Sequence, residues 1–379
     1  MKVFWSLNVL ENQLLDQIYA ILINNSDITI SIFPMNVNYE ELSNHPLNQL
    51  DNFILLNRKN IKSYKSYIIK FILHLLFNQY DLIDTKMAQS KESYIVYLVS
   101  KIFRKNYLVN LYGKERYILD KNKNVTKKFS ERVIKVLQNS IFHICNDKTL
   151  VEVSKYVGKE NYLLYNAINF ERFFSIKKEN IVVPTIFYNH RLIPDKRPMV
   201  FFEAINILKN KNLTFKVIIV GSKRLESTLG EKVNSYINEK QLEKYIEWID
   251  YRVDGNMMNK LYSQSDITVN ISELIVPSLS TLEAMASGLS PIISNEIDSE
   301  KYVEDGKNGL IVNSNAEELA DKLELIIQNK NLREEFGMES QKRVSLHFDI
   351  NKWGKIYGDL YRYILDNGPL PKSFMEYEI

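Results

Sequence analysis

Short apolar strands alternate with amphipathic helices along most of this chain, and this alternation constrains the fold more than any other feature. In the first half, the stretches that read as strands are KVFWSL, DITISIF, YDLIDTK, NYLVNLYG, SIFHICND and NYLLYNAI. Between them, stretches such as 11–24, 61–77 and 148–157 have apolar residues at helical spacing. Strands that alternate with helices in this way form a parallel sheet with helices on both faces. We therefore expect an α/β fold.

The alternation breaks at NFERFFSIKKEN (169–180), which reads as a linker, and then restarts. The later strands are IVVPTIFYNHR, FKVIIVG, YIEWID, DITVNI, PIIS and GLIVNS, and a helix is expected over 316–328. A chain of 379 residues is long enough for two hydrophobic cores. We predict two doubly wound, Rossmann-like domains, residues 1–178 and 179–349, with a ligand site in the crevice at the carboxyl ends of the strands.

Basic residues are concentrated in the first half of the chain. Residues 1–180 contain 25 Lys and Arg against 17 Asp and Glu, whereas the remainder contains 24 against 29. A basic half favours an anionic partner, which is a phosphorylated lipid, a membrane surface or a nucleic acid. The alternative is a lysine-rich surface that only contacts solvent.

The single cysteine and the N-terminal residues indicate in which cellular compartment the protein is expected. Cys145 is the only cysteine, so the chain has no disulfide framework and no cysteine-based zinc site. The N-terminal MKVFWSLNVLENQ lacks the apolar run of a signal peptide. The most apolar stretch, Ile68 to Phe77, is too short to cross a bilayer. We expect a cytoplasmic protein that can associate with the inner face of a membrane.

The stretch STLEAMASGL (280–289) carries one acidic residue, Glu283, between two buried strands. If a helix begins there, Thr281 and Leu282 present free backbone N–H groups that suit a diphosphate. A carboxylate in that first turn suits the two hydroxyls of a ribose, and Gly288 permits the left-handed residue that ends the helix. The alternative is that Glu283 only complements the helix dipole, worth about 0.3–1 kcal/mol.

Several segments together resemble one known family. LEAMASGLSPIIS followed by YVEDGKNGLIVNSNAEELADKLELII closely resembles the C-terminal half of family-4 glycosyltransferases, which have the GT-B fold. LLYNAINFERF (163–173), FKVIIVG (215–221) and LYSQSDITVNIS (261–272) match further segments of that family, with weaker matches towards the N-terminus. The resemblance implies a GT-B fold in which the two domains face each other across a cleft. It also implies that a C-terminal helix within 350–379 crosses back onto the first domain.

The resemblance assigns donor-binding roles in the second domain. YNHRLIPDKRP (188–198) stands where the family has an arginine and then a lysine, and Arg191 and Lys196 match these positions. Two cations beside a helix N-terminus would stabilise the leaving diphosphate, so that no metal is required. Gly221 would let the donor approach the strand end. His190 is a further candidate for contact with sugar or phosphate, although a lone histidine is more often structural.

Two positions depart from the family pattern. The family has an acidic residue eight positions before the helix glutamate, where this chain has Ile275, and Glu273 is the substitute expected to bind the donor sugar. The glycine-rich loop after the first strand is replaced by SLNVLENQ. In NLYGKER, Tyr112 and Gly113 occupy positions that relatives use on the acceptor side. Tyr112 could bond a sugar hydroxyl but is a poor base at neutral pH.

The implied reaction is the transfer of a sugar from a nucleotide-diphosphate donor, a UDP- or GDP-sugar, with retention at the anomeric carbon. The expected catalytic residues are Arg191, Lys196 and Glu273, and the expected acceptor is a glycan or lipid-linked glycan, with no cofactor and no metal. A possible partner of the basic first domain is an anionic membrane surface. One alternative is an acceptor that is a nucleic-acid base or modified nucleoside. Another is a non-catalytic GT-B scaffold subunit of a transferase complex.

Overall fold

The computed structural model divides the chain into two compact units, Met1–Asn166 with the C-terminal segment from Ile350, and Ala167–Asp349. The structure describes residues 1–57, 59–112, 114–119, 131–179, 181–221, 228–249, 253–273, 278–296, 298–366 and 368–371.

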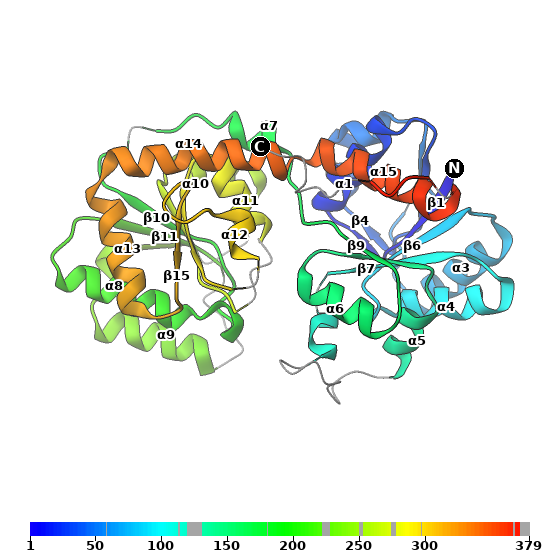
Figure 1. The fold of residues 1–379 in the computed structure, drawn as a ribbon, viewed down its shortest axis with the longest axis horizontal. Helices are drawn as coiled ribbons and strands as arrows, with labels where there is room; N and C mark the ends of the chain where they lie inside the picture. Colours follow the sequence, from blue (N-terminus) through cyan, green and yellow to red (C-terminus); the bar gives the residue numbers. More distant parts are fainter. Residues whose placement is uncertain are drawn as a thin grey trace. The chain divides into compact units, whose positions relative to one another are not determined.

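The first unit is built on a seven-stranded sheet in the order β5-β3-β1-β6-β7-β8-β9, and every pairing described in it is parallel (Figure 1). Its strands are β1 (Lys2–Ser6), β3 (Thr29–Ile32), β5 (Phe53–Leu55), β6 (Leu82–Lys86), β7 (Tyr107–Leu111), β8 (Phe142–Cys145) and β9 (Asn161–Leu163). Helices α3 (Tyr64–Phe77), α4 (Lys91–Phe103), α5 (Glu131–Asn139) and α6 (Lys148–Tyr156) pack on one face. Strands that are buried on both faces agree with the near-continuous apolar runs in the sequence.

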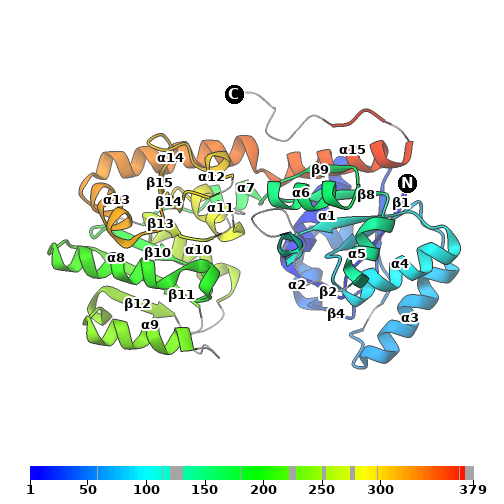
Figure 2. The same ribbon diagram turned by 60° about the horizontal axis from the view of Figure 1, so that its bottom comes forward.

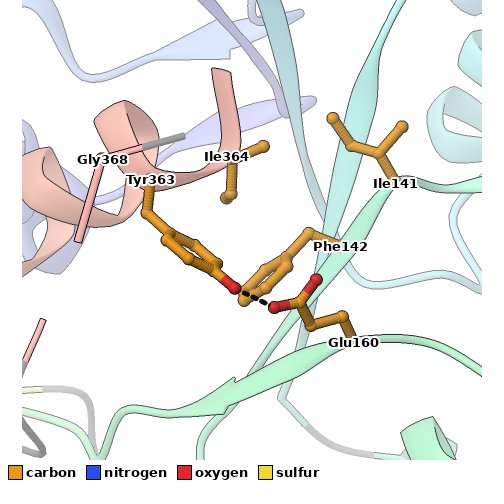
Figure 3. A pocket seen from close by; sticks show the side chains of 6 residues that line it. All are labelled: Ile141, Phe142, Glu160, Tyr363, Ile364 and Gly368. Atoms are coloured by element: carbon orange, nitrogen blue, oxygen red, sulfur yellow. Dashed lines mark hydrogen bonds between the residues drawn. The ribbon is translucent and has the colours of Figure 1, made fainter. Parts of the chain in front are cut away.

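The other face of this sheet is covered by α1 (Asn12–Asn24) and the C-terminal helix α15 (Ile350–Asp366), which pack against each other. Close packing requires glycine on α15, because a Cβ at Gly354 would collide with the backbone of Ala20. At the end of α15, the Tyr363 hydroxyl donates to Glu160 beside Phe142 (Figure 3). The prediction that the C-terminal helix returns to the first half of the chain is confirmed.

A buried polar network fixes α15 to the sheet. The Asp84 carboxylate in β6 accepts hydrogen bonds from Tyr357 at 2.8 Å and Tyr361 at 2.7 Å. Lys86 Nζ lies 3.0 Å from the same carboxylate, 2.9 Å from Tyr357 Oη, and 3.6 Å above the centre of the Trp5 ring. Burial lowers the pKa of Lys86 to about 8, although Asp84 opposes this effect. Because each charge is paired and hydrogen-bonded, the network is tolerated in an apolar interior.

The second unit is built on a six-stranded sheet in the order β12-β11-β10-β13-β14-β15, again parallel in every described pairing (Figure 2). Its strands are β10 (Thr185–Tyr188), β11 (Lys216–Val220), β12 (Ile246–Ile249), β13 (Ile267–Asn270), β14 (Ser290–Ser294) and β15 (Leu310–Val312). Its main helices are α8 (Pro198–Asn210), α9 (Thr228–Glu239), α10 (Gly255–Ser263), α11 (Leu279–Ala286), α13 (Ala316–Gln328) and α14 (Lys330–His347). The α/β class and the parallel sheets in two Rossmann-like halves are therefore confirmed.

The segment expected to be a linker folds as part of the second unit. Asn169 is the N-cap of helix α7 (Phe170–Phe174), and its side chain accepts a hydrogen bond from the Arg172 N–H. Phe173 packs edge-on against Tyr262, and Lys178 Nζ donates to the carbonyl of Tyr262 at 3.0 Å. The division between the units thus precedes the expected boundary at 178, because the aromatic residues of this segment pack with the second unit.

Candidate functional site

The loops that carry most of the predicted site residues meet at one edge of the second sheet. In the order β11-β10-β13-β14, the carboxyl ends of neighbouring parallel strands lie side by side. Gly221 follows β11, Arg191 and Lys196 follow β10, and Glu273 follows β13. The short helix α11 begins in the same crossover between β13 and β14. Ligands of doubly wound sheets bind at this edge.

Two of these loops are directly joined through Lys196. Lys196 ends a single 3₁₀ turn (Pro194–Lys196), and its Nζ donates to Ser272 Oγ at 2.9 Å. The Glu273 N–H donates to the Asp195 carbonyl at 2.8 Å, which holds the same two loops together through the backbone. The structure therefore brings the predicted Lys196 and the backbone of Glu273 into one local arrangement.

A chain of polar side chains continues from Lys196 to the start of α11. Ser272 donates to Asn270 Oδ1, and Asn270 Nδ2 donates to Thr281 Oγ1 at 3.0 Å. Thr281 Oγ1 lies 2.8 Å from Ser278 Oγ. Asn270, Ser272 and Thr281 are all buried. The cation and the helix N-terminus are thus fixed relative to each other, although the sequence analysis did not assign Asn270 or Ser272. The polar residues at the end of the DITVNIS strand were the available signal.

Helix α11 begins earlier in the sequence than expected. This corrects the prediction that the amides of Thr281 and Leu282 are free. Ser278 is the N-cap, and the N–H groups of Thr281 and Leu282 both donate to the Ser278 carbonyl, at 2.9 and 3.3 Å. They are therefore not free to bind a ligand. Leu279 and Ser280, the first two helical residues, carry the amides that have no intrahelical partner at a helix start.

Glu283 lies beyond the first turn of α11, contrary to the prediction, because the helix already begins at Leu279. Its Oε2 accepts a hydrogen bond from the Tyr262 hydroxyl at 2.8 Å. Burial, followed by the charge of Glu283, raises the pKa of Tyr262 well above its ordinary value. Tyr262 consequently remains a hydrogen-bond donor that orients the carboxylate. The predicted left-handed residue that ends α11, Gly288, is confirmed with φ of 79°.

Arg191 and Gly221 are accessible at this edge. The Arg191 side chain is exposed and makes no hydrogen bond or ion pair with the part of the chain that the structure describes. Gly221 has φ of 145°, and its carbonyl accepts from Trp248 Nε1 at 2.8 Å. A Cβ there would lie 3.6 Å from the His190 carbonyl, so the positive φ, and not crowding, accounts for the glycine.

His190 is oriented towards the protein interior. Its Nε2 donates to the Val269 carbonyl at 2.9 Å, and its ring packs edge-on against Tyr188. Burial, and then the charge of Lys196, lowers the pKa of His190 to about 3, so the ring is neutral. This geometry favours the structural role that the sequence analysis kept as the usual one for a lone histidine.

Glu273 is exposed and lies near an arginine that the sequence analysis did not single out. Arg197 Nε is 4.0 Å from the Glu273 carboxylate, and Arg197 Nη1 donates to Glu296 at 2.7 Å. Arg197 also donates to Ser314, so it links the loops after β10, β14 and β15. Ile275, the position that Glu273 is expected to replace, lies outside the described residues.

The acceptor-side candidates belong to the first unit. Tyr112 follows β7, and its hydroxyl donates to Asn110 Oδ1 at 3.4 Å. Burial, followed by the charge of Asp84, raises the pKa of Tyr112, so the phenol is a hydrogen-bond donor and not a base. Gly113 lies outside the described residues.

Among the residues that the structure describes, no group of His, Cys, Asp and Glu is arranged to hold a metal ion. In the same set of residues, none of the helices has the length and apolar character needed to cross a bilayer.

Sequence comparison finds a known family model that matches most of the second unit. Residues 169–343 match the family described as Glycosyl transferases group 1. A poly(ribitol-phosphate) alpha-N-acetylglucosaminyltransferase from Staphylococcus aureus is 25% identical over 201 residues, which is 51% of this chain and 39% of the relative. Spore coat protein SA from Bacillus subtilis is 25% identical over 166 residues, or 42% of this chain and 43% of that protein. The matched region thus spans about two fifths of each curated relative.

Solved structures match nearly the whole chain. The Anabaena HepE structure in complex with UDP-glucose superposes with a TM-score of 0.73 and 16% identity, covering 95% of this chain and 99% of that one. At this identity the match shows the fold alone, and the fold of both units is that of GT-B glycosyltransferases. The assignment to family 4 in particular stays a prediction.

Proposed function

We propose that this chain, which carries a glycosyl transferases group 1 domain over residues 169–343, is a glycosyltransferase that uses a nucleotide-diphosphate sugar. The observation that carries the proposal is the hydrogen-bonded chain from Lys196 through Ser272 and Asn270 to Thr281 in α11. It places a cation and a helix N-terminus at the carboxyl edge of the same sheet. This combination suits a diphosphate, which carries negative charge and accepts hydrogen bonds from backbone amides.

In the proposed mechanism, Arg191 and Lys196 bind the diphosphate and stabilise the charge that develops on it as the glycosidic bond breaks. Arg191 is exposed at this edge, and Lys196 is held by Ser272. The amides of Leu279 and Ser280 add hydrogen-bond donors to the same group. Preorganised donors of this kind are effective because they need no rearrangement during the reaction.

The ribose and the donor sugar are assigned to two carboxylates. Glu283, oriented by the Tyr262 hydroxyl, accepts hydrogen bonds from the ribose hydroxyls. Glu273, whose side chain is 56% exposed, binds hydroxyls of the transferred sugar, with Arg197 nearby to orient it. His190 is proposed to support the strand end through Val269. Gly221 leaves room for the donor because it has no side chain.

The proposed transfer retains the anomeric configuration and is independent of metal and of other cofactors. The acceptor attacks from the side on which the diphosphate leaves, so that no protein nucleophile is needed. The protein then contributes orientation and charge stabilisation. Measuring turnover with and without EDTA tests the metal independence, and NMR of the product distinguishes retention from inversion.

UDP-sugars are the donors proposed first, with GDP-sugars as the alternative, because the Anabaena neighbour was solved with UDP-glucose. The acceptor is proposed to be a glycan or lipid-linked glycan that carries phosphate. The Staphylococcus relative acts, by its name, on poly(ribitol-phosphate), which is an anionic polymer. The basic first half of the chain suits such an acceptor electrostatically. In this proposal the enzyme works in the cytoplasm.

The proposal is tested by screening the hydrolysis of UDP- and GDP-sugars with the wild-type protein and with Arg191→Ala. We expect slow release of the nucleoside diphosphate from a preferred donor, reduced by about 10²–10³-fold in Arg191→Ala. Lys244→Ala is the matched control, since this exposed lysine lies at the opposite end of the sheet, before β12. Failure of every donor to be hydrolysed or bound would favour the scaffold alternative.

A further inference from the structure

Helices α3 and α4 of the first unit expose large apolar side chains that the proposed reaction does not use. The six side chains, with their exposed fractions, are Phe77 (81%), Ile102 (71%), Ile69 (58%), Phe103 (52%), Leu73 (46%) and Leu98 (41%). On α3, Ile69, Leu73 and Phe77 are four residues apart and therefore form one stripe. Scattered exposed apolar residues are ordinary, whereas a group of them on neighbouring elements marks an interaction surface.

The two helices lie side by side (Figures 1 and 2), and a hydrogen bond joins their C-terminal ends. Lys105, just after α4, donates from Nζ to the carbonyl of Asn78, just after α3, at 2.7 Å. This bond brings the end that carries Phe77 next to the end that carries Ile102 and Phe103. We call the exposed side chains of α3 and α4, with their flanking lysines, the α3–α4 face.

Basic residues predominate among the charges on and beside the α3–α4 face. No acidic residue occurs between Asp51 and Asp81, and none occurs between Glu92 and Glu115. The exposed cations on or beside the two helices include Lys62, Lys65, Lys70, Lys101 and Arg104. Among the residues that the structure describes, none of these five forms an ion pair. Glu92, at the other end of α4, is buried, and its carboxylate accepts a hydrogen bond from the Tyr64 hydroxyl at 3.1 Å.

We propose that the α3–α4 face docks on the surface of an anionic lipid bilayer. Exposed Phe, Ile and Leu insert between the headgroups, while lysine and arginine contact lipid phosphates, which is the combination found in interfacial helices. A second copy of the chain fits less well, because a symmetric dimer through this face would place two sets of unpaired cations against each other. Docking of this face does not depend on catalysis; its use, to reach a lipid-linked acceptor, rests on the proposed function.

The apolar contribution is tested by co-sedimentation with vesicles of phosphatidylcholine, with or without phosphatidylglycerol. We expect the full chain to bind the vesicles that contain phosphatidylglycerol and not those of phosphatidylcholine alone. The double variant Phe77→Ser/Ile102→Ser should bind about tenfold more weakly or worse. Val182→Ser is the matched control, because Val182 is 86% exposed in the second unit and should leave binding unchanged.

The charge contribution is tested with Lys65→Gln/Lys101→Gln, for which binding should fall about thirtyfold. Lys244→Gln is the control. Equal binding of the wild type to both vesicle types would overturn the proposal. Unchanged binding by both Phe77→Ser/Ile102→Ser and Lys65→Gln/Lys101→Gln would also overturn it. A dimer in sedimentation velocity that is lost in Phe77→Ser/Ile102→Ser, without vesicle binding, would also overturn it in favour of self-association. Arg191→Ala should bind vesicles normally, which separates this outcome from failure of the proposed transferase.

Discussion

Lys196 Nζ donates to Ser272 Oγ at 2.9 Å, which ties a cation after β10 to the residue that closely follows β13. The strands β10 and β13 are neighbours in the sheet but distant in the sequence. The hydrogen bond between the loops that follow them fixes the position of the Lys196 ammonium group. If this group binds the diphosphate, loss of the cation and loss of its support should have graded effects. Lys196→Ala should lower the turnover number by about 10²–10³-fold.

Ser272→Ala keeps the cation but removes its hydrogen-bond acceptor, so we expect a smaller effect, a loss of up to about tenfold in kcat/KM. Steady-state kinetics of donor hydrolysis measures both variants, with Lys244→Ala as the reference. A Ser272→Ala enzyme that matches this reference would show that the contact does not position the lysine.

The role assigned to Glu283 predicts a difference between ligands. Glu283→Gln keeps the size of the side chain but weakens hydrogen bonds from the ribose hydroxyls, because a charged acceptor becomes neutral. Affinity for UDP should fall by about tenfold, whereas affinity for inorganic pyrophosphate, which has no ribose, should be unchanged. Calorimetric titration with both ligands distinguishes these outcomes. An equal loss for both ligands would show that Glu283 acts on the diphosphate region instead.

Gly221 should resist substitution because of its backbone, and a side chain there would also occupy space that the donor is proposed to use. Its φ of 145° is rarely adopted by other residues, so Gly221→Ala should destabilise the protein by about 1–3 kcal/mol and weaken UDP binding. Gly158→Ala is a useful control, since Gly158 in the first unit also has a positive φ, of 72°. It should cost stability in the same assay and leave UDP affinity unchanged. Thermal unfolding with and without UDP provides both readings.

The lowered pKa of His190 should make the stability of the protein depend on pH. Its pKa falls from the ordinary 6.5 to about 3 on folding, chiefly through burial. The unfolded chain therefore binds a proton at a higher pH than the native chain does. Stability contributed by this residue is complete above about pH 6.5 and is lost, by about 1.4 kcal/mol per pH unit, as the pH falls towards 3. His190→Gln, which can still donate to the Val269 carbonyl, should have a shallower acid slope in denaturant unfolding. Identical slopes would contradict this account.

The buried pair of Asp84 and Lys86 should stabilise the first unit only when both charges are present. Asp84→Asn leaves Lys86 buried without its counter-charge, so the free energy of unfolding should fall by about 3–5 kcal/mol. The double variant Asp84→Asn/Lys86→Met removes both charges and should recover part of this loss. A double-mutant cycle in urea measures the coupling, and additive losses would show that the two charges act independently.

The α/β class and both parallel sheets could be predicted because the spacing of apolar residues directly reports secondary structure. Helix α14 was not predicted, since its buried face includes Gly337 and Ser340 and has few large apolar side chains. A Cβ at Gly337 would collide with the backbone of Gly288, so close packing replaces an apolar stripe there.

The site was predicted where local motifs carry it and missed where distant residues meet. Lys196 and Glu283 lie in recognisable segments. Their partners, Ser272 and Tyr262, are fixed only by folding, as is the contact of Arg197 with Glu296, which are 99 residues apart. The position of the α11 amides that have no intrahelical partner was also missed, because the N-cap Ser278 lies before the motif that resembles the family.

The most direct test of the central claim is calorimetric titration of UDP and GDP into the wild-type protein and into Arg191→Ala/Lys196→Ala. The account predicts that one of these nucleotides binds at a single site per chain and that the double variant loses this binding while its melting temperature stays close to the wild-type value. Binding of the nucleotide to the double variant with unchanged affinity would contradict the assignment of the diphosphate site to the carboxyl edge of the second sheet.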